Sequence, residues 1–211
     1  ELFPGTEDRE TIAHEFTHAV INHSSGLIYQ RESGALNEHF ADVIAVLLDR
    51  ELGSADWTLF EKQLSGLAPS RDLSNHGSTN VASPQPAHYR NRIVLPANVA
   101  PGSANDQGGV HSNSGIPNLA AYRMIEGAFV QSITNNEPSV RINGLGAAKA
   151  RSLFYAALTS LPANATFQQA RELEIFLVEF LASRLQSGFT ATDVCDVRNA
   201  WASVGVGAYD A

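Results

Sequence analysis

The chain has 211 residues, 44% of them hydrophobic, which is enough for one sizeable core and excludes intrinsic disorder and small disulfide-dense scaffolds. Its net charge of −8, from 22 acidic and 14 basic residues, has the wrong sign for neutralising phosphates, so we expect no nucleic-acid partner. The longest aliphatic run, Val43 to Leu48, is far shorter than the roughly 20 residues that span a bilayer, and no basic segment followed by an apolar stretch opens the chain. We therefore expect neither a membrane span nor a signal peptide in this sequence.

Two helices are predicted near the start of the chain. Apolar residues repeat at helical spacing from about Glu10 to Asn22, and Ser24-Ser25-Gly26 then ends the pattern. A second repeat runs from about Gly34 to Asp49, with Gly53 just beyond its end. Because this second segment is strongly apolar, we expect it to be a central helix.

The middle of the chain has no clear period. Residues Ser65 to Ile116 hold five of the nine prolines together with many Gly, Asn and Ser residues. So long an irregular stretch inside a compact domain is typical of a functional or metal-ordered loop. Within it we predict a short strand near Arg92–Leu95.

Helical periodicity returns after this region. A helix is predicted from Pro117 through Phe129, followed by helices at Gly146–Thr159, Thr166–Gln186 and Thr192–Val204. The sequence thus predicts a mainly α fold and one domain over residues 1–211. It divides into the two first helices (1–64), a loop region (65–116) and a helical bundle (117–211).

Cys195 is the single cysteine, so no internal disulfide can form. It stands among Val194, Val197 and Trp201, and we expect it to be a small, packed apolar residue.

The first predicted helix carries a pattern suited to metal chemistry. His14 and His18 are four residues apart, which puts both imidazoles on one face, one turn apart, where they can chelate one ion. Glu15 lies about 100° round the helix from His14. A carboxylate there can take a proton from a metal-bound water and pass it to a leaving amine. The alternative is an ordinary polar helix face, because the pattern is short.

Two carboxylates on the second predicted helix strengthen the metal hypothesis. Glu38 follows His18 by twenty residues, and Asp42 lies one turn further on the same face. A catalytic zinc takes three protein ligands and keeps a fourth position open, which His14, His18 and Glu38 would satisfy. Asp42 is then placed to accept the outer N–H of a ligating histidine, and we favour His14. The alternative is a solvated acidic face.

Four stretches of the sequence carry a resemblance to a known family. They are His14-Glu15-Phe16-Thr17-His18-Ala19-Val20, then Gly26-Leu27-Ile28-Tyr29-Gln30, then Glu32-Ser33-Gly34-Ala35-Leu36-Asn37-Glu38 with Asp42, and Asp106-Gln107-Gly108-Gly109-Val110-His111-Ser112-Asn113-Ser114-Gly115-Ile116. In these stretches the chain resembles the C-terminal half of a thermolysin-like zinc metallopeptidase, of the neutral protease family. The resemblance extends along nearly all of the chain. It implies a mainly helical bundle with a long irregular loop region.

The resemblance also implies a role for each matching residue. It implies zinc on His14, His18 and Glu38; Glu15 as general base; Tyr29 and His111 as donors to the tetrahedral oxyanion; Asp106 orienting His111; Arg71 holding a substrate carbonyl on the primed side; and Leu59 contributing to substrate binding. Two preorganised donors opposite the metal can each contribute a few kcal/mol to the transition state. The remaining histidines, His23, His39, His76 and His88, are expected to be structural or surface residues.

The sequence departs from the family pattern in three respects. The N-terminal, mainly β lobe that forms the other wall of the cleft is expected to be absent, so substrate backbone would lose the edge strand it pairs with. Thr11 and Ser70 stand where aliphatic residues usually line the pocket for the residue after the cut. Thr58 replaces a carboxylate in a calcium-binding set. That set would comprise Glu10, Asp49, Asp56 and Glu61. The alternative interpretation is that these four residues are ordinary surface acids.

We therefore predict a secreted, zinc-dependent endopeptidase that hydrolyses peptides or proteins through a Glu-activated zinc-bound water. It is expected to prefer apolar residues on the primed side, and calcium is a second candidate cofactor. A propeptide or a separate N-terminal lobe is a candidate partner. The alternative is a non-catalytic, zinc-stabilised remnant that binds peptides or inhibitors, or a half-enzyme that needs its other lobe.

Overall fold

The computed structural model describes residues 9–54, 56–60, 69–76, 81, 84–131, 139–184 and 188–210. Its helices are α1 (Arg9–Asn22), α2 (Arg31–Glu51), α3 (Asp106–Asn113), α4 (Gly115–Glu126), α5 (Gly146–Ser160), α6 (Phe167–Ser183) and α7 (Ala191–Ala202). Two antiparallel strand pairs accompany them, β1 (Thr58–Leu59) with β2 (Arg71–Asp72) and β3 (Ala128–Val130) with β4 (Val140–Ile142). The predicted mainly helical fold is confirmed.

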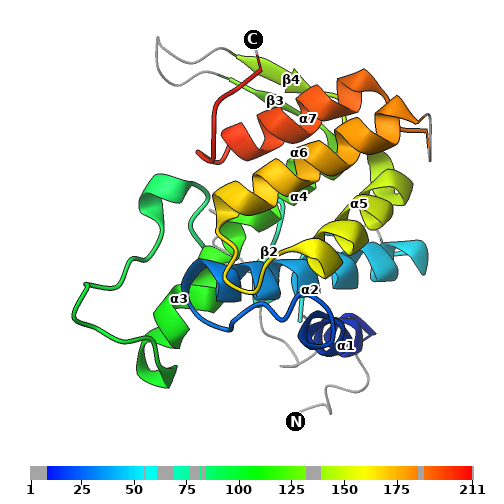
Figure 1. Ribbon diagram of the computed structural model, residues 1–211. Coiled ribbons are helices and arrows are strands. Elements are labelled where there is room, and N and C mark those ends of the chain that lie inside the picture. Colours follow the sequence, from blue (N-terminus) through cyan, green and yellow to red (C-terminus); the bar gives the residue numbers. More distant parts are fainter. Residues whose placement is uncertain are drawn as a thin grey trace.

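Helix α2 is the central element. It crosses the middle of the molecule, with α1 on one side and α6 and α7 on the other (Figure 1). Fourteen of its 21 residues are buried, so it packs against neighbours on nearly every face. At Gly34 a Cβ atom would lie 2.5 Å from the side chain of Val110, so only glycine lets α3 approach this closely. Side chains on α2 thus meet residues from several other helices.

The core lies between α2 and the C-terminal helices. Its largest fully buried side chains include Phe40, Phe154, Phe167 and Trp201, which come from α2, α5, α6 and α7. Burying each of these is worth about 1.5–3 kcal/mol. His39 is fully buried beside them, and this burial lowers its pKa to about 4, so the ring is neutral. None of the helices in the described part of the chain is long and apolar enough to cross a membrane.

Two secondary-structure predictions were wrong. No strand forms at Arg92–Leu95, because both backbone groups of Ile93 are bonded to the side-chain amide of Asn113, at 2.8 and 3.0 Å, rather than to another strand. The helix predicted through Phe129 ends at Glu126 instead. Gly127 has a φ of +84° and turns the chain out of the helix, so Phe129 lies in β3. The region predicted as irregular also contains α3.

The prediction for Cys195 was wrong as well, because its side chain is exposed. Val197 and Trp201, which do pack into the core, lie roughly 200° and 240° round α7 from it. A hydrogen bond to Asp210 raises the pKa of the Cys195 thiol. The residues next to Cys195 in sequence therefore did not indicate which face of the helix it occupies.

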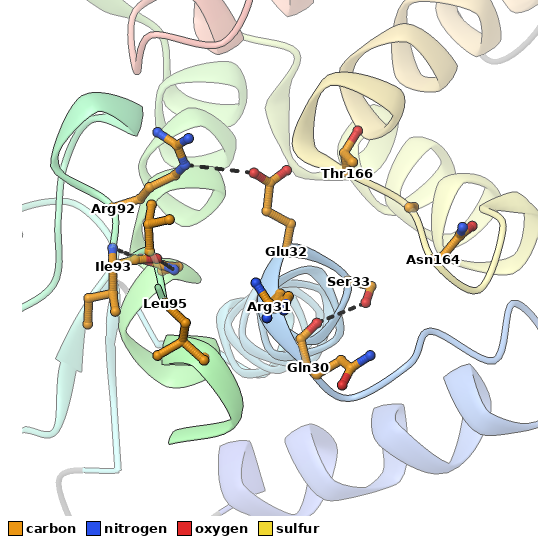
Figure 2. A pocket seen from close by; sticks show the side chains of 13 residues that line it. Gln30, Arg31, Glu32, Ser33, Arg92, Ile93, Leu95, Asn164 and Thr166 are labelled. Atoms are coloured by element: carbon orange, nitrogen blue, oxygen red, sulfur yellow. Dashed lines mark hydrogen bonds and ion pairs between the residues drawn. The ribbon is translucent and has the colours of Figure 1, made fainter. Parts of the chain in front are cut away.

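A hollow of about 350 Å³ lies between the start of α2 and two loops (Figure 2). Glu32 points into it and faces Arg92, with the two charged groups 3.9 Å apart. Its carboxylate accepts hydrogen bonds from the Tyr89 hydroxyl, at 2.7 Å, and from the backbone N–H of Phe167, at 2.9 Å. The second donor belongs to the first turn of α6, where N–H groups lack helical partners. Glu32 therefore links α2, α6 and the loop that carries Tyr89 and Arg92.

Glu174 on α6 generates a prediction about stability and pH. Its carboxyl group is fully buried and accepts one hydrogen bond from Trp201 Nε1, at 2.7 Å; its other oxygen has no partner within the described ranges. Burial raises the pKa of Glu174 from 4.5 to about 8. Between these two values the folded protein keeps a proton that the unfolded chain has lost. The free energy of unfolding should therefore fall by about 1.4 kcal/mol per pH unit from this group, and level off above pH 8.

This dependence can be isolated with Glu174→Gln, which keeps an acceptor for Trp201 and removes the ionisable group. Urea unfolding of both proteins between pH 5 and 9 should show a difference in stability that grows in favour of the variant up to about pH 8. A difference that is constant across this range would contradict a buried, protonated Glu174.

Candidate metal centre

Three potential metal ligands converge where α1 packs on α2. The Nε2 atoms of His14 and His18 lie 3.0 Å apart, as expected for residues one helical turn from each other. Glu38 on α2 places Oε2 3.7 Å from His14 Nε2 and Oε1 3.5 Å from His18 Nε2. Within the described ranges these three side chains form the one group of His, Cys, Asp or Glu whose ligand atoms lie within 4.8 Å of one another.

The donor set fits zinc in chemistry and in size. Two imidazole nitrogens and one carboxylate are a set found in catalytic zinc sites with an open fourth position. A tetrahedral ion with bonds of about 2.1 Å keeps its ligand atoms about 3.4 Å apart. The two imidazole nitrogens are 3.0 Å apart, and each has one Glu38 oxygen near that distance, Oε1 at 3.5 Å from His18 and Oε2 at 3.7 Å from His14.

The outer nitrogen of each histidine faces an oxygen acceptor on α2. His14 Nδ1 lies 3.0 Å from Asp42 Oδ1, and His18 Nδ1 lies 2.6 Å from Asn37 Oδ1. The Asn37 oxygen is a hydrogen-bond partner of His18 Nδ1, and Asp42 Oδ1 lies within ion-pair distance of His14 Nδ1; a proton on each Nδ1 leaves both Nε2 atoms free to bind a metal. Asn37 was not predicted to have a role in the site. A polar residue next to Glu38 on an otherwise apolar helix was the available signal.

Arg71 closes the buried side of the centre. It donates to Asp42 Oδ1, and its Nη2 lies 3.1 Å from Glu38 Oε2. Burial by itself would lower the pKa of Arg71, but the two carboxylates outweigh burial and raise that pKa above its ordinary value. Burial would likewise raise the pKa of Asp42, yet Arg71 and His14 hold it well below its usual range. Both carboxylates are therefore paired with cations or donors as well as facing the histidines.

Arg71 is held in place by the β1–β2 pair, in which it lies opposite Leu59. Its guanidinium group also lies 5.3 Å from the centre of the Phe60 ring. Leu59 is fully buried in the hydrophobic core and supports this strand pair from within. In this structure Leu59 therefore offers no exposed surface for the substrate contact that was predicted for it.

Tyr29 and His111 face the ligand group from the opposite side. The Tyr29 hydroxyl donates to Glu38 Oε1 and lies 3.0 Å from His111 Nε2. Burial, followed by the effect of Glu38, raises the pKa of Tyr29 well above its ordinary value. The phenol thus keeps its proton and can serve as a hydrogen-bond donor.

The segment that carries His111 is fixed by Asp106. One carboxylate oxygen lies 2.5 Å from His111 Nδ1, and the other accepts the His111 backbone N–H at 3.0 Å. Four successive residues, Asp106 to Gly109, have φ values between +51° and +91°. This left-handed run, which two glycines ease, brings the histidine back over its own aspartate.

Gln85 is a further support that the sequence analysis missed. Its side-chain amide donates to the backbone carbonyl of His111, at 2.5 Å, and to Ser114 Oγ, at 3.1 Å. It stands between Pro84 and Pro86, which favour extended backbone. A polar residue between two prolines was the only signal in the sequence.

The three candidate ligands, together with Tyr29 and His111, line a hollow of about 280 Å³. It is lined by His14, Glu15, His18, Asn22, Tyr29, Asn37, Glu38 and His111. Glu15 is exposed and stands at the rim, beside the ligands rather than among them. The structure therefore brings the three predicted ligands, the predicted base and both predicted oxyanion donors to one cavity.

The predicted calcium ligands do not form such a group. Glu10 is buried, and its carboxylate accepts the backbone N–H of Phe60 at 2.8 Å. Asp56 bonds to Ser54 and Thr58. Within the described ranges Glu10, Asp49 and Asp56 are not brought together as three cation ligands, and Glu61 lies outside those ranges. Calcium binding stays a prediction.

Comparison with known proteins identifies the family. Residues 25–206 match the family described as thermolysin metallopeptidase, alpha-helical domain, and the chain belongs to this family. It is 33% identical to a zinc metalloproteinase of Renibacterium salmoninarum, over 96% of this chain and 36% of that protein. It is 35% identical to neutral protease NprE of Bacillus pumilus, over 93% of this chain and 54% of that protein.

A solved structure is also similar, that of the precursor of protealysin, a metalloproteinase from Serratia proteamaculans. The TM-score is 0.68 at 27% sequence identity, over 94% of this chain and 57% of that chain. The chain thus spans about one third to just over half of the length of these relatives.

The geometry of the ligand group predicts a response to zinc. Added zinc should raise the melting temperature of the protein, and a chelator should reverse this, because a bound ion joins α1 to α2. His18→Ala removes one of three ligands and should abolish the shift, measured by differential scanning calorimetry. His23→Ala is the matched control, since His23 is exposed just beyond α1 and, among the hydrogen bonds of the described residues, its side chain contacts only the carbonyl of Ala19. An equal shift in all three proteins would contradict this site.

Proposed function

We propose that residues 1–211 form the zinc-dependent catalytic lobe of a neutral endopeptidase. The observation that carries this proposal is the single cavity shared by His14, His18 and Glu38, by Glu15, and by Tyr29 and His111. Membership of the thermolysin metallopeptidase family supports it, as do relatives named zinc metalloproteinase and neutral protease. His14, His18 and Glu38 would hold the zinc. When bound, zinc supplies Lewis acidity, which polarises a carbonyl oxygen and acidifies water.

Glu15 is proposed as the general base and later the general acid. Glu15 is exposed at the rim of the cavity, and among the described residues the ion pairs of His14, His18 and Glu38 do not include it. It can accept a proton from water as a peptide carbonyl is attacked and then pass that proton to the leaving amine nitrogen. One side chain thus serves both proton transfers.

Tyr29 and His111 are proposed to stabilise the oxyanion that forms from the carbonyl. The raised pKa of Tyr29 keeps its hydroxyl protonated, and Asp106 fixes the ring of His111 so that Nε2 faces the cavity. In its protonated form His111 donates from that nitrogen. Each such donor is worth about 2.7–4 kcal/mol in the transition state.

Substrate selection is proposed to follow the family. Arg71 would hold a substrate carbonyl on the primed side, and apolar residues would be preferred there. In the structure both ends of its guanidinium group engage Asp42 and Glu38, so the substrate would share a donor that is already paired. The family resemblance also supports secretion of the protein.

A half-enzyme that needs a separate lobe is the second candidate. The exposed face of α1 that carries Glu15 also carries Ile12, 50% exposed, and Phe16, 69% exposed. Large apolar side chains in a contiguous exposed stripe are typical of an interaction surface. A further lobe over this stripe would also form a wall for substrate beside Glu15.

Hydrolysis of a quenched fluorescent peptide library by the zinc-loaded protein tests the proposal. Glu15→Gln should keep zinc at one ion per chain and lower the rate to background, because the amide cannot accept the proton. Mass spectrometry of the products gives the residues on either side of each cut. Hydrolysis retained by the variant would contradict the role of Glu15. Absence of hydrolysis in the unmutated, zinc-loaded chain would favour the half-enzyme or a binding module.

The oxyanion role of His111 has its own test. His111→Ala should lower kcat by about 10²–10³, because one preorganised donor is lost, with little effect on zinc stoichiometry. His88→Ala serves as a control, since His88 lies outside the cavity. An unchanged kcat in His111→Ala would contradict the proposed role.

A further inference from the structure

A line of buried polar side chains runs from His14 away from the cavity into the core. His14 Nδ1 lies 3.0 Å from Asp42 Oδ1. Asn118 on α4 donates from Nδ2 to Asp42 Oδ2 at 2.8 Å, and its Oδ1 lies 2.9 Å from His39 Nδ1. Asp42, Asn118 and His39 are each 0% exposed. Three elements, α1, α2 and α4, are connected by this line.

We propose that Asn118 and His39 are positioning residues, which orient Asp42 and through it the zinc ligand His14. The inference rests on the proposed zinc site. It assigns a role to two residues outside the cavity lining and predicts that they set the affinity for zinc.

The hydrogen-bond directions along the line are mutually determined. An ionised Asp42 can only accept, so Asn118 must present its NH₂ group to it. The amide oxygen then faces His39 and needs a donor, so His39 must carry its proton on Nδ1. Without that donor, the buried Asn118 oxygen would lack the hydrogen-bond partner it has in the structure, and the amide would be held at its Asp42 end alone. His39 therefore fixes the orientation of Asn118.

Packing alone does not account for a histidine at position 39. Its ring lies among Phe40, Phe154 and Trp201, with ring centres 4.9 to 6.5 Å away. Its Nε2 atom has no hydrogen-bond partner in the described part of the chain, which is unfavourable relative to an apolar ring. The hydrogen bond to Asn118 is the feature that an apolar residue could not supply.

The Asp42 carboxylate has partners on both of its oxygens, so the contact with Asn118 helps to set its orientation. Its Oδ1 atom accepts a hydrogen bond from Arg71 and also faces His14. Its Oδ2 atom accepts a hydrogen bond from Asn118. If the Asn118 contact is lost, the charged Arg71 is the strongest remaining donor. The carboxylate would then shift toward Arg71, and His14 would lose the acceptor that fixes its ring.

Three variants separate this positioning role from a purely structural one. His39→Phe keeps the ring volume but removes the donor. His39→Asn keeps an N–H donor near the place of Nδ1 but leaves a cavity, and Asn118→Leu removes the donor to Asp42 at similar volume. For each, we would measure the zinc dissociation constant by competition with a chromophoric chelator, the visible spectrum with cobalt in place of zinc, and the melting temperature without metal.

We expect changes in zinc affinity that do not follow the changes in melting temperature. His39→Phe and Asn118→Leu should weaken zinc binding about 10-fold or more and alter the cobalt spectrum, as loss of outer partners of metal ligands does. His39→Asn should melt lower yet bind zinc within about 2-fold of the unmutated chain. Phe154→Leu, a core change that touches the His39 ring but not the line, should also lower stability and leave zinc affinity unchanged.

Two outcomes would overturn the inference. Zinc affinities and cobalt spectra in His39→Phe and Asn118→Leu that match the unmutated chain would show that these residues do not position His14. Affinities that fall in proportion to melting temperature in all four variants would show a structural effect only. Absence of zinc binding by the unmutated chain would overturn the proposed zinc site, and this inference with it.

Discussion

The burial of two carboxylates on the central helix is the constraint on which the rest of the site depends. Glu38 and Asp42 are 1% and 0% exposed, and a charge removed from water is costly unless cations or donors surround it. The partners come from every side: His14 and His18 from α1, Arg71 from β2, and donors from the loop before α2 and from α4. The same contacts that make burial tolerable therefore assemble the candidate metal centre.

The two walls of the cavity are built by different physical means. The wall with His14 and His18 is a helix whose spacing fixes its geometry, and α2 fixes the outer nitrogens of both rings. The wall with His111 is the short helix α3, whose first four residues have left-handed φ values, and it is held by Asp106 and Gln85. It needs these separate interactions, because residues with left-handed φ values do not continue the regular hydrogen bonds of an α-helix.

Periodicity predicted the helices well and predicted their faces less well. The helices α1, α2, α5, α6 and α7 lie within a few residues of the predicted ranges, because burial of an apolar stripe decides where a helix forms. The predictions failed for Cys195, at Arg92–Leu95 and at Phe129. In the last two cases a distant partner or a single glycine decided the outcome: Asn113 took the place of a strand partner, and Gly127 ended α4. Cys195 lies on the exposed face of α7.

The sequence by itself determined which residue types could bind zinc, since the spacing of His14 and His18 is local and Glu38 follows on the next helix. The sequence also led us to expect Asp42 beside His14. Only the tertiary structure decided that Arg71 pairs with both carboxylates and that His39 reaches Asp42 through Asn118. Asn118 lies 76 residues from Asp42, and Arg71 lies 29 residues from it. Contacts over such separations depend on how helices and strands pack, and no local pattern in a single sequence encodes that packing.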